Sequence, residues 1–431
     1  MENKDVPLFI QALREKVVPA TGCTEPVAVA LAAATSRKYL AVDEVVEQIK
    51  VAVSLNIYKN ALAVIVPGTG EPGLEVATAA GFLAGDSDKG LKVIADIEPA
   101  DVEEIITLAE SGKVQIKLAK DCPGFFVQVE LKTAQNTVTV KIVGSHTNIV
   151  GITKNDQVIL KQTEQQTSKQ PTIDDWLRTK KLRDIWDFSR EVPLEKISFM
   201  QKAAELNVAL ANEGLKNMYG LQSGRKLQQA MSEDTLDHQL LIYTQAAADA
   251  RMGGATMPAM TNSGSGNQGI TATIPVYVVA QRQKVEQEKF IRALALSHLV
   301  AIYIHSFLPV LSAFCAADSA AMGSAVGICY LFDEDFEVAQ NAINNMVEDS
   351  VGMVCDGAGC ACALKVGNAV SSMYRAVTLA QQGVAIPVSN GLISEDIDQT
   401  IRNIGQLASK GMRQTDPEIL DIMINNKWRI L

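Results

Sequence analysis

Aromatic side chains are scarce in this sequence, at 5% of 431 residues, whereas alanine and glycine are abundant. A core with few large rings must be filled by small side chains, so the composition favours helices that pack closely together. The sequence also contains no Cys-x-x-Cys pair. Structural zinc sites usually show two such pairs, so their absence weakens that interpretation of the cysteines. No glycine-rich dinucleotide-binding motif is present either.

Basic residues are in the minority, with 39 Lys and Arg against 49 Asp and Glu, and the net charge is −10. Such a surface argues against general binding to nucleic acid or to anionic membranes. A small anionic substrate needs only a local site, so this class of ligand stays open. With 47% apolar and 20% charged residues, the composition is that of a globular protein of two or three domains.

Neither the N-terminus nor the longest apolar segment indicates export or a membrane span. The first ten residues, MENKDVPLFI, are acidic and lack an apolar core followed by a cleavage site. Residues 293–317 are apolar and numerous enough to cross a bilayer, but they include His298, His305 and Pro309. We therefore interpret this segment as a buried helix and expect a cytoplasmic protein, in which thiols stay reduced.

The period of the hydrophobic pattern separates a sheet region from helical regions. Residues 24–40 are apolar on all sides, as in a buried helix. Strands are predicted at 49–57, 91–97, 114–119, 125–131, 137–143 and 158–161, with helices at 73–83 and from Glu98 onward. Later helices are predicted at 195–212, 235–251, 286–317, 335–349, 368–382 and 394–410.

The polar, aperiodic stretch QTEQQTSKQPT, residues 162–172, is the best candidate for a linker. The sequence thus predicts an α+β protein with a large, mostly α-helical domain formed by residues 1–42 and 172–431. A smaller α/β sheet domain and the linker, residues 43–171, are inserted into it.

Three of the seven cysteines lie within eight residues, in the stretch VCDGAGCACALKV. Cys360 and Cys362 are too close in sequence to make a good disulfide. Gly357 and Gly359 leave the backbone free to point N–H groups at sulfur, as in iron–sulfur proteins. From the spacing of Cys355, Cys360 and Cys362 alone, a metal or cluster site, a buried core and a redox thiol group all remain open.

The other cysteines are spread along the chain. Cys315 is expected at the end of the long apolar helix, and Cys329 and Cys122 are expected to be structural. Cys23 opens a helix in PATGCTEP, where the positive helix end lowers the pKa of a thiol and favours the thiolate. The alternative for Cys23 is a small buried residue in a tight turn.

Two further stretches contain candidates for binding and proton transfer. The segment GGATMPAMTNSGSGNQGI is rich in donors that could hold a substrate carboxylate, or it is a flexible loop. The candidate residues in this segment are Asn262, Ser263, Gly264 and Asn267. A further candidate is Lys365, which lies at the end of the cysteine stretch. Lys365 could equally be a surface lysine. His146, in GSHTNI, is a possible base, although an exposed hairpin histidine is the commoner case.

The motifs TGCTEP, FCAADSAAMGSAVG and GMVCDGAGCACALKV, in this order, resemble the L-cysteine desulfidase family. That family is similar to the α-chain of iron–sulfur L-serine dehydratases, and the resemblance covers essentially the whole chain. It implies an oxygen-sensitive [4Fe–4S] cluster held by Cys315, Cys355 and Cys362, with the fourth iron open to substrate. Cys360 competes with Cys362 as the third ligand. Cys23 matches the family's N-terminal cysteine, a base or a resting ligand to the fourth iron.

The resemblance implies α,β-elimination of L-cysteine to pyruvate, ammonia and hydrogen sulfide. A positioned base must remove the weakly acidic α-proton, and a Lewis-acidic iron suits the soft leaving sulfur. One alternative is an L-serine dehydratase with the same cluster, and another is a non-catalytic zinc or redox thiol protein. We expect a homodimer that binds a small amino acid, L-cysteine or L-serine, and neither nucleic acid nor membrane.

Overall fold

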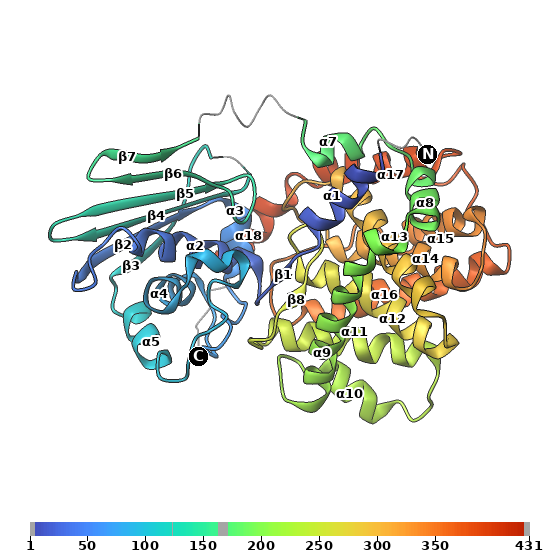
Figure 1. Ribbon diagram of the computed structural model, residues 1–431, viewed down its shortest axis with the longest axis horizontal. Coiled ribbons are helices and arrows are strands. Elements are labelled where there is room, and N and C mark those ends of the chain that lie inside the picture. The colour runs from blue at the N-terminus through green and yellow to red at the C-terminus, as the bar shows by residue number, and fades with distance from the viewer. Residues whose placement is uncertain (1–4, 123, 163–170, 426–431) are drawn as a thin grey trace.

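The chain folds into two lobes that lie side by side, one built around a sheet and one built of helices (Figure 1). The structure is a computed structural model that describes residues 5–122, 124–162 and 171–425. The predicted α+β class is confirmed. The site discussed below lies where the two lobes meet.

The sheet lobe contains a six-stranded mixed sheet with the strand order β3-β2-β4-β5-β6-β7. Its strands are β2 (Val46–Val53), β3 (Val114–Leu118), β4 (Phe126–Thr133), β5 (Thr137–Val143), β6 (Ile149–Lys154) and β7 (Gln157–Lys161). Only β2 and β3 pair in parallel. In β4, Val127, Val129 and Leu131 are fully buried and alternate with more exposed residues, because successive side chains point to opposite faces.

Helices cover one face of this sheet (Figure 1). They are α2 (Thr24–Arg37), α3 (Leu55–Ala61), α4 (Leu74–Ala84) and α5 (Val102–Glu110), with the 3₁₀ turn η1 (Ser87–Lys92). The residues of α2 from Thr24 to Ser36 are all buried. Their side chains belong to the hydrophobic core of the sheet lobe, together with those of the strands. The domain boundary predicted after residue 42 stays a prediction, but the core of the sheet lobe begins earlier, with α2.

One strand prediction in this lobe was wrong, and one strand was not predicted. Residues 91–97 do not form a strand but continue from η1 into turns, and Gly90 has a φ of +54°. The side chains of Val93 and Ile94 are buried in the core of this lobe. Their burial gives the sequence a strand-like hydrophobic pattern, although the segment pairs with no described strand. Conversely, β6 was missed because Gly151 and flanking polar residues interrupt its alternation.

The helical lobe contains thirteen described helices. They are α1 (Val6–Lys16), α7 (Ile173–Leu177), α8 (Leu182–Glu191), α9 (Gln201–Lys216), α10 (Ser223–Ala230), α11 (Leu236–Met252), α12 (Gly266–Gln283), α13 (Gln287–Ser306), α14 (Ala316–Leu331), α15 (Phe336–Ser350), α16 (Cys362–Gln381), α17 (Ile397–Gln406) and α18 (Thr415–Asn425). Short turns η2 (Leu194–Lys196), η3 (Ser198–Met200) and η4 (Leu407–Gly411) link some of them, and β1 (Pro19–Ala20) pairs with β8 (Ala259–Met260). The centre of the lobe is formed by α11, α12, α13 and α14, whose buried residues are largely small and aliphatic.

The long apolar segment forms two helices and not the single predicted one. Helix α13 ends at Ser306 and α14 begins at Ala316, with an irregular segment between them that contains Pro309. A proline cannot donate the backbone hydrogen bond that would continue the helix. Cys315 therefore precedes the first turn of α14, contrary to the prediction that it ends the long helix. No helix in the described ranges has the length and apolarity needed to cross a membrane.

Close contact between α2 and α4 generates a stability prediction at Gly81. A Cβ atom added at Gly81 would lie 2.2 Å from the backbone oxygen of Ala30, so a side chain there must push the two helices apart. Alanine gains about 1 kcal/mol in helix propensity over glycine. Overpacking costs about 1–3 kcal/mol and outweighs this gain, since a backbone atom cannot turn away. We expect Gly81→Ala to lower the urea midpoint of unfolding.

The matched control is Gly124→Ala, because a Cβ there would meet no atom within 4 Å. This variant is expected to unfold at the wild-type urea concentration. Equal midpoints for Gly81→Ala and the wild type would contradict the close packing of α2 on α4.

Candidate functional site

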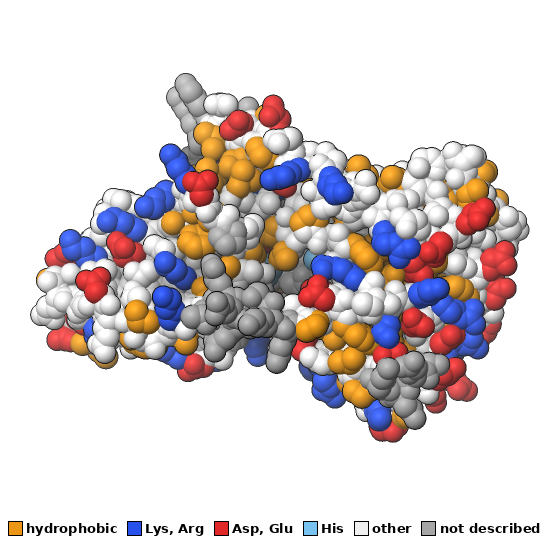
Figure 2. Space-filling view, turned by 90° about the horizontal axis from the view of Figure 1, so that it is seen from above, with side chains coloured by type: hydrophobic (Ala, Val, Ile, Leu, Met, Phe, Trp, Pro, Cys, Tyr) orange, Lys and Arg blue, Asp and Glu red, His pale blue; other side chains and the backbone are white. Residues whose placement is uncertain are grey.

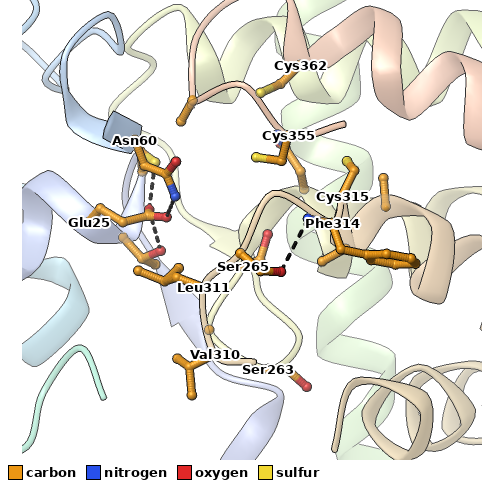
Figure 3. Close-up of a pocket in the computed structure, with 18 of the residues that line it drawn as sticks. Glu25, Asn60, Ser263, Ser265, Val310, Leu311, Phe314, Cys315, Cys355 and Cys362 are labelled. Carbon is orange, nitrogen blue, oxygen red and sulfur yellow. Dashed lines mark hydrogen bonds between the residues drawn. The ribbon is translucent and has the colours of Figure 1, made fainter. Parts of the chain in front are cut away.

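A pocket lies between the two lobes and receives residues from both (Figure 3). Figure 2 shows the surface hollowed at this junction, with hydrophobic side chains gathered along it. The sheet lobe contributes Cys23, Thr24, Glu25, Asn60 and His146, and the helical lobe contributes Arg251, Met252, Ser263–Ser265, Asn267, His305, 308–312, 314–317, Cys355, Ala358, Cys362, Lys365 and Val366. This set contains all the predicted site residues except Asn262 and Cys360, together with several residues that the sequence did not single out.

Cys315, Cys355 and Cys362 all face this pocket with free thiols (Figure 3). Cys315 precedes α14, Cys355 lies in a loop, and Cys362 begins α16. An antiparallel bridge joins Phe314 and Val354. The Cys315 N–H donates to the Met353 carbonyl at 3.0 Å, and the Cys355 N–H donates to the Ala313 carbonyl at 2.7 Å. Cysteines about forty residues apart in sequence are therefore fixed next to each other by backbone bonds.

Burial and the neighbouring thiols perturb Cys315 and Cys362. Loss of solvent, then the nearby Cys355, raise the pKa of the Cys315 thiol well above its usual value. The same two causes raise the pKa of Cys362 to about 11. Among the described residues, no three His, Cys, Asp or Glu side chains are arranged to ligate a single metal ion. The arrangement is therefore a set of crowded thiols without the tight tetrahedral geometry of a zinc site.

Cys360 lies apart from this group. It is half-buried, its sulfur approaches the Met252 carbonyl at 4.0 Å, and it does not line the pocket. A Cβ on Gly220 would lie 3.3 Å from its sulfur, so Cys360 packs against the turn before α10. Between the two candidates for the third thiol, the structure places Cys362 on the pocket.

A buried carboxylate, Glu25, forms the opposite wall of the pocket (Figure 3). It accepts hydrogen bonds from the Cys23 thiol at 3.0 Å, the Thr24 hydroxyl at 3.1 Å and the Asn60 amide at 2.8 Å. Burial opposes its ionisation, but His146 and the hydrogen bonds from Cys23 and Asn60 outweigh burial and lower the pKa of Glu25. Sequence reasoning missed Glu25, although it belongs to the TGCTEP motif.

The thiol of Cys23 behaves differently from the prediction. It does precede the first turn of α2, yet burial and the negative charge of Glu25 raise its pKa well above the usual value. The helix end does not compensate for these two effects. Cys23 is therefore a neutral thiol that donates to Glu25, and not a preformed thiolate.

His146 is buried, and the exposed-hairpin interpretation is wrong. Its ring packs edge-on against Phe125 at 4.7 Å between centroids, and it is 7% exposed. Burial lowers its pKa, although Glu25 acts in the opposite direction. Within the described part of the chain its Nε2 has no hydrogen-bond partner. Gly264, with a φ of +85°, lies against the ring, since a Cβ there would be 2.9 Å from Cε1.

Arg251, the next to last residue of α11, is a second residue that sequence reasoning missed. It is 4% exposed and lines the pocket, yet no carboxylate in the described ranges forms an ion pair with it. Its Nη1 contacts the Met252 sulfur at 3.3 Å, and its Nε has no partner among the described residues. A buried guanidinium without an anion is costly, so this site is suited to an anionic ligand. Sequence reasoning could not separate Arg251 from a surface arginine.

The loop before α12 is ordered by internal bonds. Asn262 is fully buried and its amide nitrogen donates to Nδ1 and the carbonyl of His298, both at 3.1 Å. Its amide oxygen accepts from Gln268 at 2.8 Å and from Ser263 at 3.0 Å. Asn262 does not line the pocket, so its predicted contact with substrate is replaced by a structural role in holding the loop.

The remaining predicted binding residues do line the pocket. Ser263, Gly264 and Asn267 face it, and the amide oxygen of Asn267 has no partner among the described residues. Lys365 also reaches the pocket, but its ammonium group pairs with Asp356 and donates to the Val354 carbonyl at 2.9 Å. Its charge is thus already compensated within the cysteine loop, unlike that of Arg251.

Comparisons with known proteins agree with the motif order. The family model for the serine dehydratase alpha chain matches residues 88–421. A UPF0597 protein of Latilactobacillus sakei is 54% identical and covers 97% of this chain and 98% of that protein. A UPF0597 protein of Chromobacterium violaceum is 43% identical with 98% coverage of both chains, and UPF0597 protein YhaM of Escherichia coli is 43% identical with 96% coverage of both.

The similarity to these relatives thus extends along nearly the full length of the chain. The chain belongs to the serine dehydratase alpha chain family, as its motifs predicted, and the relationship to these lyases makes it an enzyme. The names of the UPF0597 relatives state no activity.

His298, which holds the loop through Asn262, gives a prediction for the pH dependence of stability. The Thr273 hydroxyl donates to the Gly269 carbonyl at 2.6 Å and so accepts from His298 Nε2 at 3.0 Å, which leaves Nδ1 as an acceptor. Burial lowers the pKa of His298 to about 3, against 6.5 when exposed. The unfolded chain therefore binds more protons between these values, and the free energy of unfolding must fall as the pH falls from 6.5 towards 3.

The loss is at most about 5 kcal/mol, at about 1.4 kcal/mol per pKa unit. Urea unfolding of the wild type and of His298→Gln across this range measures it, and the variant should show a smaller dependence on pH. His238→Gln, at a residue outside this network, is the control and should match the wild type. Identical pH dependence in all three proteins would contradict the neutral, buried state of His298.

Proposed function

We propose that the chain is a [4Fe–4S]-dependent L-cysteine desulfidase, a lyase that converts L-cysteine and water to pyruvate, ammonia and hydrogen sulfide. The observation that carries the proposal is the composition of one pocket. It combines three free thiols, a buried Cys23–Glu25 pair and an arginine without an anionic partner.

The donor set fits an iron–sulfur cluster. Cys315, Cys355 and Cys362 are free, face one pocket, and come from segments whose backbone holds two of them in place. Thiolates are the usual ligands of such clusters, and three of them leave one iron available. When bound there, the cluster would supply a Lewis acid that favours a soft sulfur leaving group.

Arg251 and Asn267 are suited to hold the amino-acid end of the substrate. A guanidinium pairs with a carboxylate through two parallel hydrogen bonds, and Arg251 is buried on the pocket without a competing anion. The unpartnered amide oxygen of Asn267 can accept from the substrate ammonium group. Together they would orient the α-carbon between the acid–base residues and the three thiols.

Cys23 and Glu25 are suited to remove the α-proton. Glu25 is a carboxylate and accepts the hydrogen bond of the Cys23 thiol at 3.0 Å. As the Cβ–S bond of the substrate breaks, the sulfur of Cys23 takes the α-proton while the thiol proton of Cys23 passes to Glu25, so the pair gains one proton and no free thiolate has to form. The aminoacrylate product leaves the pocket and hydrolyses to pyruvate and ammonia.

The second candidate is an L-serine dehydratase, which would use the same residues with a hydroxyl leaving group. The family's name favours this candidate. Measuring kcat/KM for L-cysteine and L-serine on the same preparation separates the two. A higher value for L-serine would replace the desulfidase assignment with the dehydratase.

The cluster itself is tested by anaerobic purification of single-cysteine variants. The wild type and Cys360→Ala should be brown and contain iron and sulfide, because Cys360 lies off the pocket. Cys362→Ala should lose most of this iron, since it removes one of three ligands. Exposure to air should bleach the wild type. A colourless wild type, or one that contains only zinc, would sink the proposal.

The role of Arg251 is tested by Arg251→Gln, which removes the charge and leaves a shorter, polar side chain. A hydrogen bond to a charged group contributes about 1.5–3 kcal/mol, which corresponds to about a 10–100-fold rise in KM. Iron content should be unchanged. Arg282→Gln, at an arginine paired with Asp234 outside the pocket, is the control and should keep the wild-type KM. A normal KM in Arg251→Gln would remove the residue from the site.

A further inference from the structure

A buried ion pair lies beside the pocket and joins the end of the chain to the sheet lobe. Lys59, on α3, has a side chain with no exposed surface, and its Nζ lies 2.9 Å from Oδ1 of Asp416 on α18. Helix α18 lies next to α3, between the two lobes (Figure 1). An isolated charge at such a site would be very costly, so each partner depends on the other.

Each member of this pair also binds the backbone of one cysteine segment. The Lys59 ammonium donates to the Cys355 carbonyl at 2.8 Å. Asp416 Oδ2 accepts from the Ala313 N–H at 3.0 Å, two residues before Cys315. These two backbone groups belong to the residues that flank the Phe314–Val354 bridge. The ion pair therefore binds the Cys355 carbonyl and the Ala313 N–H, two backbone groups that the hydrogen bonds of the bridge do not use.

The cysteine loop follows α3 so closely that glycine is needed. Gly357 has a φ of +116°, and a Cβ there would lie 2.8 Å from the Lys59 carbonyl oxygen. The Met423 methyl group of α18 lies 3.6 Å from the same position. Lys59, the cysteine loop and α18 are thus in mutual contact, which the sequence spacing of these segments does not indicate.

We infer that α18 is a clasp that holds the Cys315 and Cys355 segments in position through the Lys59–Asp416 ion pair and so retains the metal centre. This inference rests on the proposed function, since it assigns the clasp to the three proposed ligands. Lys59 and Asp416 are positioning residues that touch neither substrate nor the thiols. Partners that orient ligands commonly change metal affinity about 10–100-fold when they are removed.

The test measures how fast an iron chelator removes iron from anaerobically prepared full-length protein. Asp416→Asn should lose iron about 10-fold or more faster than the wild type. The matched control is Asp421→Asn, an exposed residue of the same helix, which should lose iron at the wild-type rate. Asp416→Glu keeps the charge and should restore slow release in part. Thermal unfolding of each variant shows whether the release follows from global instability.

A double variant covers the case in which Asp416→Asn does not fold. Lys59→Met with Asp416→Leu replaces the pair by apolar residues, which commonly preserves a fold. It still removes both backbone contacts, so iron should again be released faster. In iron-free protein, the same variants should raise the rate at which iodoacetamide alkylates Cys315 and Cys355, with Cys360 as the internal reference.

The outcomes separate the two proposals. A wild type that never carries iron overturns the proposed function, while the alkylation rates still report on the clasp. Iron in the wild type, with wild-type release and alkylation rates in folded Asp416 variants, overturns the clasp and leaves the proposed function intact. Faster release and faster alkylation in these variants, at unchanged thermal stability, support the clasp.

Discussion

The short antiparallel bridge between Phe314 and Val354 is the contact on which the candidate site depends. It aligns two irregular segments, one before α14 and one before α16, that would otherwise have no reason to lie together. Two backbone hydrogen bonds hold Cys315 and Cys355 beside this bridge. The buried Lys59–Asp416 pair binds the Cys355 carbonyl and the Ala313 N–H. The thiols are therefore positioned by the protein before any ligand arrives, which is the condition for an accurate metal site.

Two charged residues of the pocket, Glu25 and Arg251, differ in the partners that the protein gives them. Glu25 accepts hydrogen bonds from three donors, whereas Arg251, which also lines the pocket, has no anionic partner among the described residues. An interior position makes such an unpaired charge expensive unless a ligand completes it. A zwitterionic amino acid carries the carboxylate that Arg251 lacks. The pocket is thus incomplete in the way expected of a binding site and not of a structural core.

Helix α3 connects these two features. Asn60 donates to Glu25, and the adjacent Lys59 binds the Cys355 carbonyl and Asp416. Neighbouring residues on one short helix thereby position a buried carboxylate and one cysteine segment. The sheet lobe, to which α3 belongs, is more than a cover for the helical lobe, since it supplies Cys23, Glu25 and His146 to the pocket.

Much of the fold could be predicted from local patterns. Alternating hydrophobicity identified β4 and β5, because each pairs on both sides and buries one face, and it also identified the edge strand β3. The alternating pattern predicted a false strand at residues 91–97, where buried side chains fill the core without strand pairing. The continuous apolar pattern did not reveal the end of α13 at Ser306. The motifs identified the family and the cysteines, since thiols beside glycines are unusual in a core. Exposure of His146 was misjudged because its burial comes from Phe125 and Gly264, which lie far away in sequence.

By itself, the sequence determined the α+β class and the family and singled out the clustered cysteines, because these depend on composition, period and motif. Only the tertiary structure decided that Cys362 faces the pocket while Cys360 does not, and that Arg251 is buried with no ion-pair partner among the described residues. It also decided that the thiol of Cys23 stays protonated beside Glu25. The physical reason is that burial and charge partners arise from contacts between distant segments, and these set pKa and accessibility more strongly than neighbours in sequence do.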